Sequence, residues 1–352
     1  MTRQIHIGKI ALGGGAPIVV QSMCNTPAED APATLAQIER LAALGCQVIR
    51  CALPRESAIE PFRQICAASP LPVIADIHFD YRLALAAIDA GAAGIRVNPG
   101  NIRSLEGITE TAHRAAQSNT TVRVGVNMGS LSPKAQEKYG RTAEAMVASA
   151  IEYLKIFEDA GCTNLKVSLK SSDLKTTVDA CRRFHELSDW PQHIGLTESG
   201  TPNAGIIKSA IGIGALLLDG IGDTIRVSLT APPEEEIKAA YRILDALGLR
   251  PGRPQLVSCP TCGRTRIDLI GLAEKVEHEI DAILAAGHQI ALKKIAVMGC
   301  EVNGPGEAAD ADLGIAGGNG QGLLFAHGKI IRAFPENELL QNFLDELNKF
   351  VK

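Results

Sequence analysis

Short apolar runs rich in Val and Ile recur along the first two-thirds of the chain, and each is followed by an Ala- and Leu-rich stretch with helical spacing. The eight runs lie at residues 18–23, 47–51, 72–78, 94–98, 122–127, 164–170, 193–198 and 223–229. Continuous apolar runs alternating with helices are typical of parallel strands covered by helices and joined by right-handed crossovers. Eight units over about 235 residues predict a TIM-type (β/α)8 barrel, with an open doubly wound sheet as the alternative.

The segments that flank these units predict a floor for the barrel and a second domain. Residues 5–20 are typical of a hairpin with a Gly-rich turn, which we expect to close the barrel floor. Residues 248–254, GLRPGRP, have the composition of a linker. Residues 255–352 then show a strand, a helix at about 268–286, a strand, further short strands and a last helix from about Glu336. We therefore predict a barrel domain at 1–247 and a small α+β domain at 255–352.

Composition and charge argue against several classes of protein. The chain has 352 residues, of which 46% are hydrophobic and 21% charged, a composition typical of globular proteins. A net charge of −4 argues against binding nucleic acid or an anionic membrane through overall charge. The sequence has no apolar run of the roughly 18 residues that cross a bilayer, and its start does not resemble a signal peptide. We expect a cytoplasmic protein that binds neither nucleic acid nor membrane.

Polar residues gather where the predicted barrel strands end, which is where active sites form in this fold. At least five are cationic, and a barrel interior normally packs Val, Ile and Leu because an unpaired buried charge is costly. Arg and Lys suit phosphate oxygens, so we predict a diphosphate-type anion site, with structural ion pairs as the alternative. The predicted substrate-binding residues are Arg50, Asp76, His78, Arg96, Asn98, Arg123, Asn127, Lys166, Ser168, Lys170, Lys208, Arg226 and Ser228.

Nine cysteines cannot all pair internally, and in a reducing compartment they are expected to be thiols or metal ligands. Six lie in apolar segments, and we interpret them as core residues. The other three, Cys259, Cys262 and Cys300, lie beside Gly and Pro in the second domain. Two residues separate Cys259 from Cys262, a spacing that lets two thiolates bind one metal centre.

Because this domain has no fourth cysteine, Glu307 is the nearest candidate for a fourth ligand, with Glu301 as its competitor. An iron–sulfur cluster with three thiolates and one oxygen ligand fits that count. A radical adenosylmethionine enzyme would have closer cysteine spacings in one loop, which disfavours that class. A structural zinc site is the other alternative. The histidines that could complete a zinc site are His278, His288 and His327.

A set of segments in fixed order gives the chain a specific family likeness. The segments are QSM, DIHFDYRLAL, IRVNPGNI, RVGVN, KVSLK, KSAIGIG, GIGDTIRVSL, CPTCGR and GCEVNGPGE, with ADLGIAGG after them. Over essentially its whole length the sequence closely resembles the 4-hydroxy-3-methylbut-2-enyl diphosphate synthase family, iron–sulfur enzymes of the methylerythritol phosphate route to isoprenoids. The resemblance implies a [4Fe-4S] cluster whose ligands fall on Cys259, Cys262, Cys300 and Glu307.

The resemblance also implies a reaction and partners. The substrate would be 2-C-methyl-D-erythritol 2,4-cyclodiphosphate, reduced by two electrons with ring opening and loss of water to 4-hydroxy-3-methylbut-2-enyl diphosphate. Reduced flavodoxin or ferredoxin would be the electron donor, and the enzyme would be a head-to-tail homodimer. Because a carboxylate binds iron less firmly than a thiolate, Glu307 is also a catalytic candidate, and we hypothesise that Glu198 supplies a proton or polarises the departing hydroxyl. The alternative is a non-redox phosphate-binding barrel enzyme, of the pterin type for example, with a structural zinc tail domain.

Overall fold

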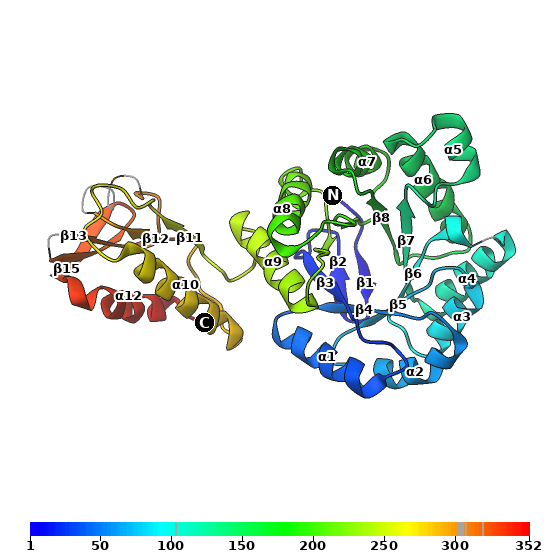
Figure 1. Cartoon of the computed structure of the whole chain (residues 1–352), viewed down its shortest axis with the longest axis horizontal. Coiled ribbons are helices and arrows are strands. Elements are labelled where there is room, and N and C mark those ends of the chain that lie inside the picture. Colours follow the sequence, from blue (N-terminus) through cyan, green and yellow to red (C-terminus); the bar gives the residue numbers. More distant parts are fainter. Residues whose placement is uncertain (103, 301–305, 307, 319) are drawn as a thin grey trace. The chain divides into compact units, whose positions relative to one another are not determined.

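The computed structural model describes residues 1–102, 104–300, 306, 308–318 and 320–352 (Figure 1). Internal contacts divide the chain into two compact units, Met1–Ile243 and Leu244–Lys352. The division falls inside helix α9 (Pro233–Ala246), a few residues before the expected boundary at residue 247. The linker expected at 248–254 stays a prediction.

Eight parallel strands form a closed ring in the first unit. Each strand pairs with the next along the chain, β10 pairs with β3, and a bridge between Val167 and Gln192 joins β8 to β9. This closure confirms the predicted barrel and excludes the open sheet. The strands are β3 (Val19–Met23), β4 (Val48–Ala52), β5 (Val73–Asp76), β6 (Gly94–Val97), β7 (Thr121–Asn127), β8 (Leu165–Lys170), β9 (His193–Ile194) and β10 (Thr224–Ile225).

A helix follows every strand and packs outside the ring (Figure 1). Several helices begin at a side chain that caps their first turn, as Asp173 does by accepting a hydrogen bond from Thr176 N at 2.7 Å. A short helix, α5 (Pro133–Tyr139), precedes α6. The eight crossover helices are α1 (Ala31–Ala43), α2 (Ile59–Ala68), α3 (Tyr81–Asp89), α4 (Leu105–Ser118), α6 (Ala143–Asp159), α7 (Leu174–Leu187), α8 (Pro202–Leu218) and α9.

Strands β9 and β10 are much shorter than the runs 193–198 and 223–229 that predicted them. Gly195, directly after β9, has φ +151, and Glu198 has φ +55, so the backbone leaves the extended conformation there. A Cβ on Gly195 would lie 2.3 Å from Arg226 O, so the two chain segments approach too closely for any other residue. The apolar runs therefore predicted longer strands than the backbone forms, because the sequence stays apolar beyond the point where the extended conformation ends.

The expected N-terminal hairpin is present as β1 (Ile5–Ile7) and β2 (Ile10–Leu12). Thr121 Oγ1 donates to His6 O at 2.6 Å, and His6 N donates to Asn164 Oδ1 at 3.2 Å. Thr121 and Asn164 lie at the amino ends of β7 and β8. The hairpin therefore closes the floor of the barrel, as predicted.

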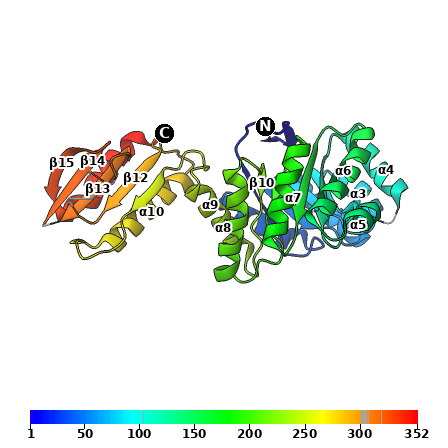
Figure 2. The same ribbon diagram turned by 90° about the horizontal axis from the view of Figure 1, so that it is seen from above.

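The second unit is a five-stranded sheet in the order β11-β12-β13-β14-β15. The first three strands are parallel and the last two antiparallel. Helices α10 (Leu269–Ala285) and α12 (Leu339–Leu347) share one hydrophobic core with the sheet (Figure 2). This is the predicted α+β domain. The strands are β11 (Gln255–Ser258), β12 (Lys294–Met298), β13 (Leu313–Gly318), β14 (Gln321–Ala326) and β15 (Lys329–Pro335).

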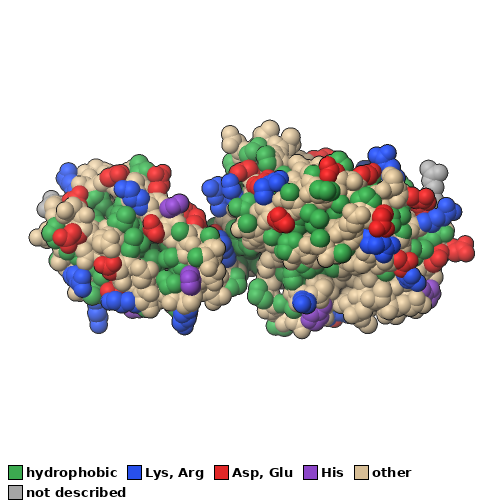
Figure 3. Space-filling model, turned by 90° about the horizontal axis from the view of Figure 1, so that it is seen from below, with side chains coloured by type: hydrophobic (Ala, Val, Ile, Leu, Met, Phe, Trp, Pro, Cys, Tyr) green, Lys and Arg blue, Asp and Glu red, His purple; other side chains and the backbone are tan. Residues whose placement is uncertain are grey.

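Charged side chains of both signs lie among hydrophobic and other side chains on the surface (Figure 3). Figure 3 shows basic and acidic side chains interspersed over one face. Within the part of the chain that the structure describes, no helix combines the length and the apolar character needed to cross a membrane.

Candidate functional site

A cavity of about 290 Å³ opens among the carboxyl ends of the barrel strands. Five Arg and Lys side chains line it, each on or directly after a different strand, and Asp76 on β5 is the acidic residue among the described residues of the lining. This is the strand end at which the sequence placed the anion site. The predicted residues that line the cavity are Arg50, Asp76, His78, Arg96, Arg123, Asn127, Ser168, Lys170, Arg226 and Ser228.

Asp76 is the centre of an ion-pair network in the cavity wall. Its Oδ2 atom lies 3.7 Å from Arg50 Nε and 3.4 Å from His78 Nε2, and its Oδ1 atom lies 3.2 Å from Arg96 Nη1. Burial raises the pKa of Asp76, but the charge of Arg50, the hydrogen bond of His78 and the charge of Arg96 together lower it well below its usual range. The carboxylate therefore stays ionised at neutral pH and offsets part of the positive charge.

Arg123 and Lys166 lie opposite each other on β7 and β8, and neither forms an ion pair with a carboxylate of the described residues. Arg123 is 2% and Lys166 1% exposed. Among the described residues, neither Arg123 Nε nor Lys166 Nζ has a hydrogen-bond partner. Burial, and then the neighbouring positive charges, lower the pKa of both groups well below their ordinary values. Because a buried unpaired cation costs several kcal/mol, an anionic ligand would stabilise this arrangement.

Two of the cations have further partners, one on helix α9 and one in the cavity wall. Arg226 Nη2 lies 3.3 Å from both carboxylate oxygens of Glu236 on α9. Arg50 donates through Nη2 and Nε to Met23 Sδ, at 2.9 and 3.2 Å, and burial lowers the pKa of Arg50 to about 10. Ion pairs within the described residues therefore account for the buried charge of Arg226 and for part of that of Arg50 and Arg96. They do not account for Arg123.

Four predicted site residues in the barrel are not among the cavity's lining residues. Asn98 is 1% exposed, and Lys166 lies one inward-facing position below Ser168 on β8. Lys208 Nζ donates to Ser172 O at 2.7 Å, just beyond the end of β8. Glu198 is exposed and directly follows Thr197, which does line the cavity. Glu198 therefore lies in the loop that leaves the cavity rim.

The sequence interpretation missed the lining residues Met23, Gly125, Val126 and Thr197. Met23 ends β3, so the strand-end rule applied to it, but a thioether does not suggest an anion site. Gly125 leaves room for a guanidinium, because a Cβ at this position would lie 3.0 Å from Arg96 Nε. A glycine inside a strand pattern is the signal from which this close approach could have been predicted.

In the second unit, two of the three candidate cysteines follow neighbouring strands. Cys259 directly follows β11 and Cys300 lies two residues after β12. The strands are parallel with Ser258 opposite Val297, so the loops that carry the cysteines lie side by side. Gly299 N donates to Cys259 Sγ at 3.2 Å, linking the two loops.

The thiols of this region differ in exposure. Cys262 is exposed, Cys259 half-buried and Cys300 buried. Hydrogen bonds from Arg264, first from its backbone, lower the pKa of Cys262 and favour its thiolate. Among the described residues, no three His, Cys, Asp or Glu side chains form a group that could hold a metal ion. Glu307 and Glu301 lie outside the described residues.

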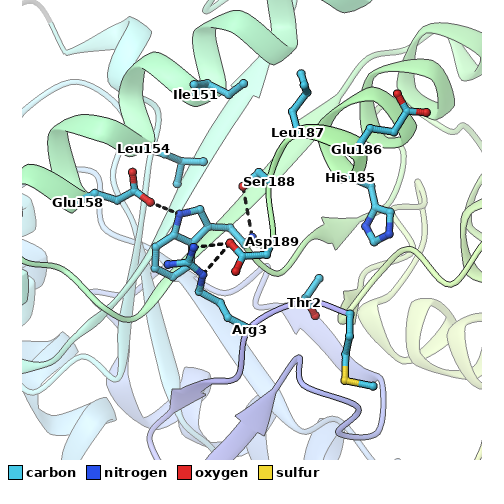
Figure 4. A pocket seen from close by; sticks show the side chains of 12 residues that line it. Thr2, Arg3, Ile151, Leu154, Glu158, His185, Glu186, Leu187, Ser188 and Asp189 are labelled. Carbon is cyan, nitrogen blue, oxygen red and sulfur yellow. Dashed lines mark hydrogen bonds and ion pairs between the residues drawn. The ribbon is translucent and has the colours of Figure 1, made fainter.

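A second cavity, of about 550 Å³, lies at the amino end of the barrel beside the first residues of the chain. Figure 4 shows Arg3 beside Asp189, with which it forms an ion pair. The Arg3 guanidinium also lies 3.6 Å from the centre of the Trp190 ring, and Trp190 Nε1 donates to Glu158 Oε1 at 2.6 Å. These polar groups satisfy one another, so their packing accounts for them.

A closed (β/α)8 barrel with a surplus of buried cations at its carboxyl end, joined to an α+β unit with a CxxC pair and a third thiol, defines a class. The class is that of two-domain enzymes whose barrel can bind an anionic substrate and whose second unit carries thiols of the kind that bind metals. The model of the GcpE TIM-barrel domain matches residues 2–241, and that of the GcpE protein C-terminal domain matches residues 255–349. The chain belongs to the GcpE family.

Curated relatives match the chain over its whole length. The chain is 51% identical over 351 residues to a protein of Geobacter sulfurreducens, covering 99% of this chain and 98% of that one. It is 48% identical over 352 residues to a protein of Lawsonia intracellularis, covering 99% and 96%. Both relatives are named 4-hydroxy-3-methylbut-2-en-1-yl diphosphate synthase (flavodoxin).

Among solved structures, a dihydropteroate synthase of Yersinia pestis in complex with a sulfonamide drug superimposes with a TM-score of 0.51 at 11% identity. The match covers 70% of this chain and 100% of that one. At this identity the likeness shows the barrel fold alone. It does not support the pterin-type alternative.

Proposed function

We propose that this protein catalyses the two-electron reductive ring opening of 2-C-methyl-D-erythritol 2,4-cyclodiphosphate to 4-hydroxy-3-methylbut-2-enyl diphosphate in isoprenoid biosynthesis. Reduced flavodoxin, which the names of the relatives specify, is the proposed electron donor, and ferredoxin is the alternative donor. The observation that carries the proposal is the cation surplus of the cavity, which suits a doubly charged cyclic diphosphate.

The proposed cofactor is a [4Fe-4S] cluster held by Cys259, Cys262, Cys300 and Glu307. Three soft thiol donors on adjoining loops suit iron–sulfur ligation. When bound, the cluster would relay to the substrate, one at a time, the two electrons that the donor delivers. Zinc at these thiols could not supply electrons, because it has no redox chemistry, whereas the names of the relatives specify a flavodoxin-linked reaction.

The residues of the barrel bind and orient the substrate. In this proposal Arg96, Arg123 and Lys170 bind diphosphate oxygens, and Asp76 positions Arg50 and Arg96 through its ion pairs. Asn127, Ser168 and Ser228 line the same cavity and orient the substrate's oxygens by hydrogen bonding. Glu198, in the loop at the rim, supplies a proton to the departing hydroxyl.

We also propose how the chain is organised and assembled. The barrel at 1–247 binds the substrate, the domain at 255–352 holds the cluster, and 248–254 links them. Two chains form a head-to-tail homodimer in which the cluster of one serves the barrel of the other. Free thiols at all nine cysteines suit a reducing cytoplasm. Heterodimers of an Arg123→Met chain with a Cys300→Ser chain should recover activity that neither variant has alone, whereas verified heterodimers without activity would contradict this assembly.

The test of the function is product formation by the anaerobically purified full chain. The assay supplies the cyclodiphosphate and chemically reduced flavodoxin and measures 4-hydroxy-3-methylbut-2-enyl diphosphate by mass spectrometry. The proposal expects one product molecule per two electrons consumed. A cluster-loaded protein that binds the cyclodiphosphate but yields no product with flavodoxin or ferredoxin would overturn it.

A further inference from the structure

A polar layer lies inside the barrel below the cavity and does not line it. Lys166 is 1%, His193 0% and Gln21 2% exposed. Side chains alternate between the two faces of a strand, so Lys166 shares the inner face of β8 with Ser168 and Lys170. Lys166 Nζ, His193 Nε2 and both amide atoms of Gln21 have no hydrogen-bond partner among the described residues. This layer is therefore polar, enclosed and unsatisfied.

The nearby carboxylates are engaged elsewhere. Asp76 pairs with Arg50 and Arg96. Asp223, below the layer, accepts hydrogen bonds from Thr2 Oγ1 at 2.7 Å and Gln192 N at 2.8 Å. Glu236 pairs with Arg226. No carboxylate of the described residues forms an ion pair with Lys166. The arginines that face the same interior are Arg50, Arg96, Arg123 and Arg226. Lys170 also faces it, and burial and these arginines lower its pKa too, but it is half-buried and lines the cavity.

These surroundings determine which group can change its charge. Arginine remains protonated in proteins, whereas a buried lysine readily loses its proton. Burial, followed by the charges of Arg123 and Arg50, lowers the pKa of Lys166, and Asp223 raises it by less. Burial and the same cations lower the pKa of His193, whose Nδ1 lies 2.8 Å from Thr224 Oγ1. Burial among these cations, with no carboxylate paired to either group in the described residues, therefore favours the neutral forms of Lys166 and His193.

We propose that Lys166 is a positioning residue of the anion site that takes up one proton from solvent when a dianion enters the cavity above it. The Nζ lone pair accepts the proton, no bond of the ligand changes, and the bound dianion compensates the new charge. The uptake adds one positive charge beneath the ligand only while the ligand is present. The identity of the natural dianion rests on the proposed function.

The experiment measures protons taken up by the full chain, cluster-loaded and without reductant, as it is saturated with ligand in weakly buffered solution. The ligand is the cyclodiphosphate, because each of its phosphorus atoms carries a single acidic oxygen that is already ionised at neutral pH. The wild type should take up about one proton more than Lys166→Met. As the pH rises above neutrality, the Kd of the wild type should increase more steeply than that of Lys166→Met, by up to about tenfold per pH unit. Lys155→Met, at an exposed i,i+4 pair with Asp159, is the matched control and should behave as wild type.

Equal proton uptake by the wild type and a folded Lys166→Met would overturn the proposal. Lys166→Arg carries a permanent charge, so it should show the same loss of proton uptake as Lys166→Met. It replaces the methionine variant in the test if that variant does not fold. A wild type that takes up no proton overturns the proposal without any variant. Inorganic sulfate, a fully ionised dianion that is no substrate, separates the two proposals. Lys166-dependent uptake with sulfate but no binding of the cyclodiphosphate would reject the function and retain the role of Lys166.

Discussion

The two ends of the barrel both hold arginines, yet they differ in what those arginines contact. At the amino end, Arg3 has an aromatic ring and a carboxylate as partners. At the carboxyl end, Arg123 is almost completely buried among other cations, and its Nε has no partner among the described residues. Charge that the chain itself neutralises stabilises a fold, whereas buried charge left without a counter-ion indicates a ligand of opposite sign.

The cysteines show the same contrast on a smaller scale. Cys181 is buried on α7, and burial raises its pKa to about 12, which makes it inert. Cys262 is exposed beside hydrogen-bond donors that lower its pKa. In both comparisons, the group that we propose to be functional is the one that the rest of the fold leaves available.

The largest expected effect tests the contrast between the cysteines. Replacing Cys262 or Cys300 with Ser should remove a thiolate ligand and lower turnover by about 10⁴-fold or more, because the electrons can no longer be delivered. The measurement is product formation with reduced flavodoxin. Cys66→Ala is the matched control, at a half-buried thiol of α2, and should retain nearly full turnover. Equal losses in the control and the ligand variants would contradict the distinction.

A second prediction concerns the cavity rim. Glu198→Gln keeps the shape of the side chain but removes its proton, so kcat should fall by roughly 10²–10⁴-fold while substrate affinity changes little. Glu186→Gln, at an exposed position near the amino end of the barrel, provides the control. Full turnover in the Glu198 variant would remove this residue from the mechanism.

The third prediction compares the two ends of the barrel directly. Arg123→Met should weaken binding of the cyclodiphosphate by about 10- to 100-fold, the worth of one charged hydrogen bond. Arg3→Met should leave binding unchanged and lower the melting temperature slightly, since it loses a cation–π contact worth about 1 kcal/mol. Calorimetric titration of both variants checks this. Weakened binding in the Arg3 variant alone would reverse the assignment of the two ends.

The last prediction concerns stability rather than turnover or binding. The pKa of Asp76 lies below its ordinary value, so its contribution to stability is present above about pH 4 and is lost as the pH falls through the lower folded value. Asp76→Asn should cost about 3 kcal/mol at neutral pH and flatten the loss of stability in acid. Urea unfolding at neutral and acidic pH measures both. Parallel stability curves for wild type and variant would show that Asp76 is not the group that titrates.

Much of the fold was predictable because hydrophobic period and helix caps are local. The helix expected at about 268–286 is α10 with Asp268 at its cap. The depth at which each inward-facing side chain lies within the barrel was not predictable. Lys166 and Lys170 share one face of β8, but the sequence does not tell which one reaches the cavity, because that depends on the stagger of neighbouring strands. Neither does it tell that β11 and β12 are neighbours, which brings the loops of Cys259 and Cys300 together.

The account rests on a redox centre in the second domain that serves an anion site in the barrel. Its most direct test is the iron, sulfide and zinc content of anaerobically purified protein, together with its Mössbauer spectrum. We predict about four irons and four sulfides per chain, with one iron distinct from the other three because its ligand is a carboxylate. One zinc per chain, without sulfide even after anaerobic reconstitution, would contradict the account and leave the barrel as an anion-binding site without redox chemistry.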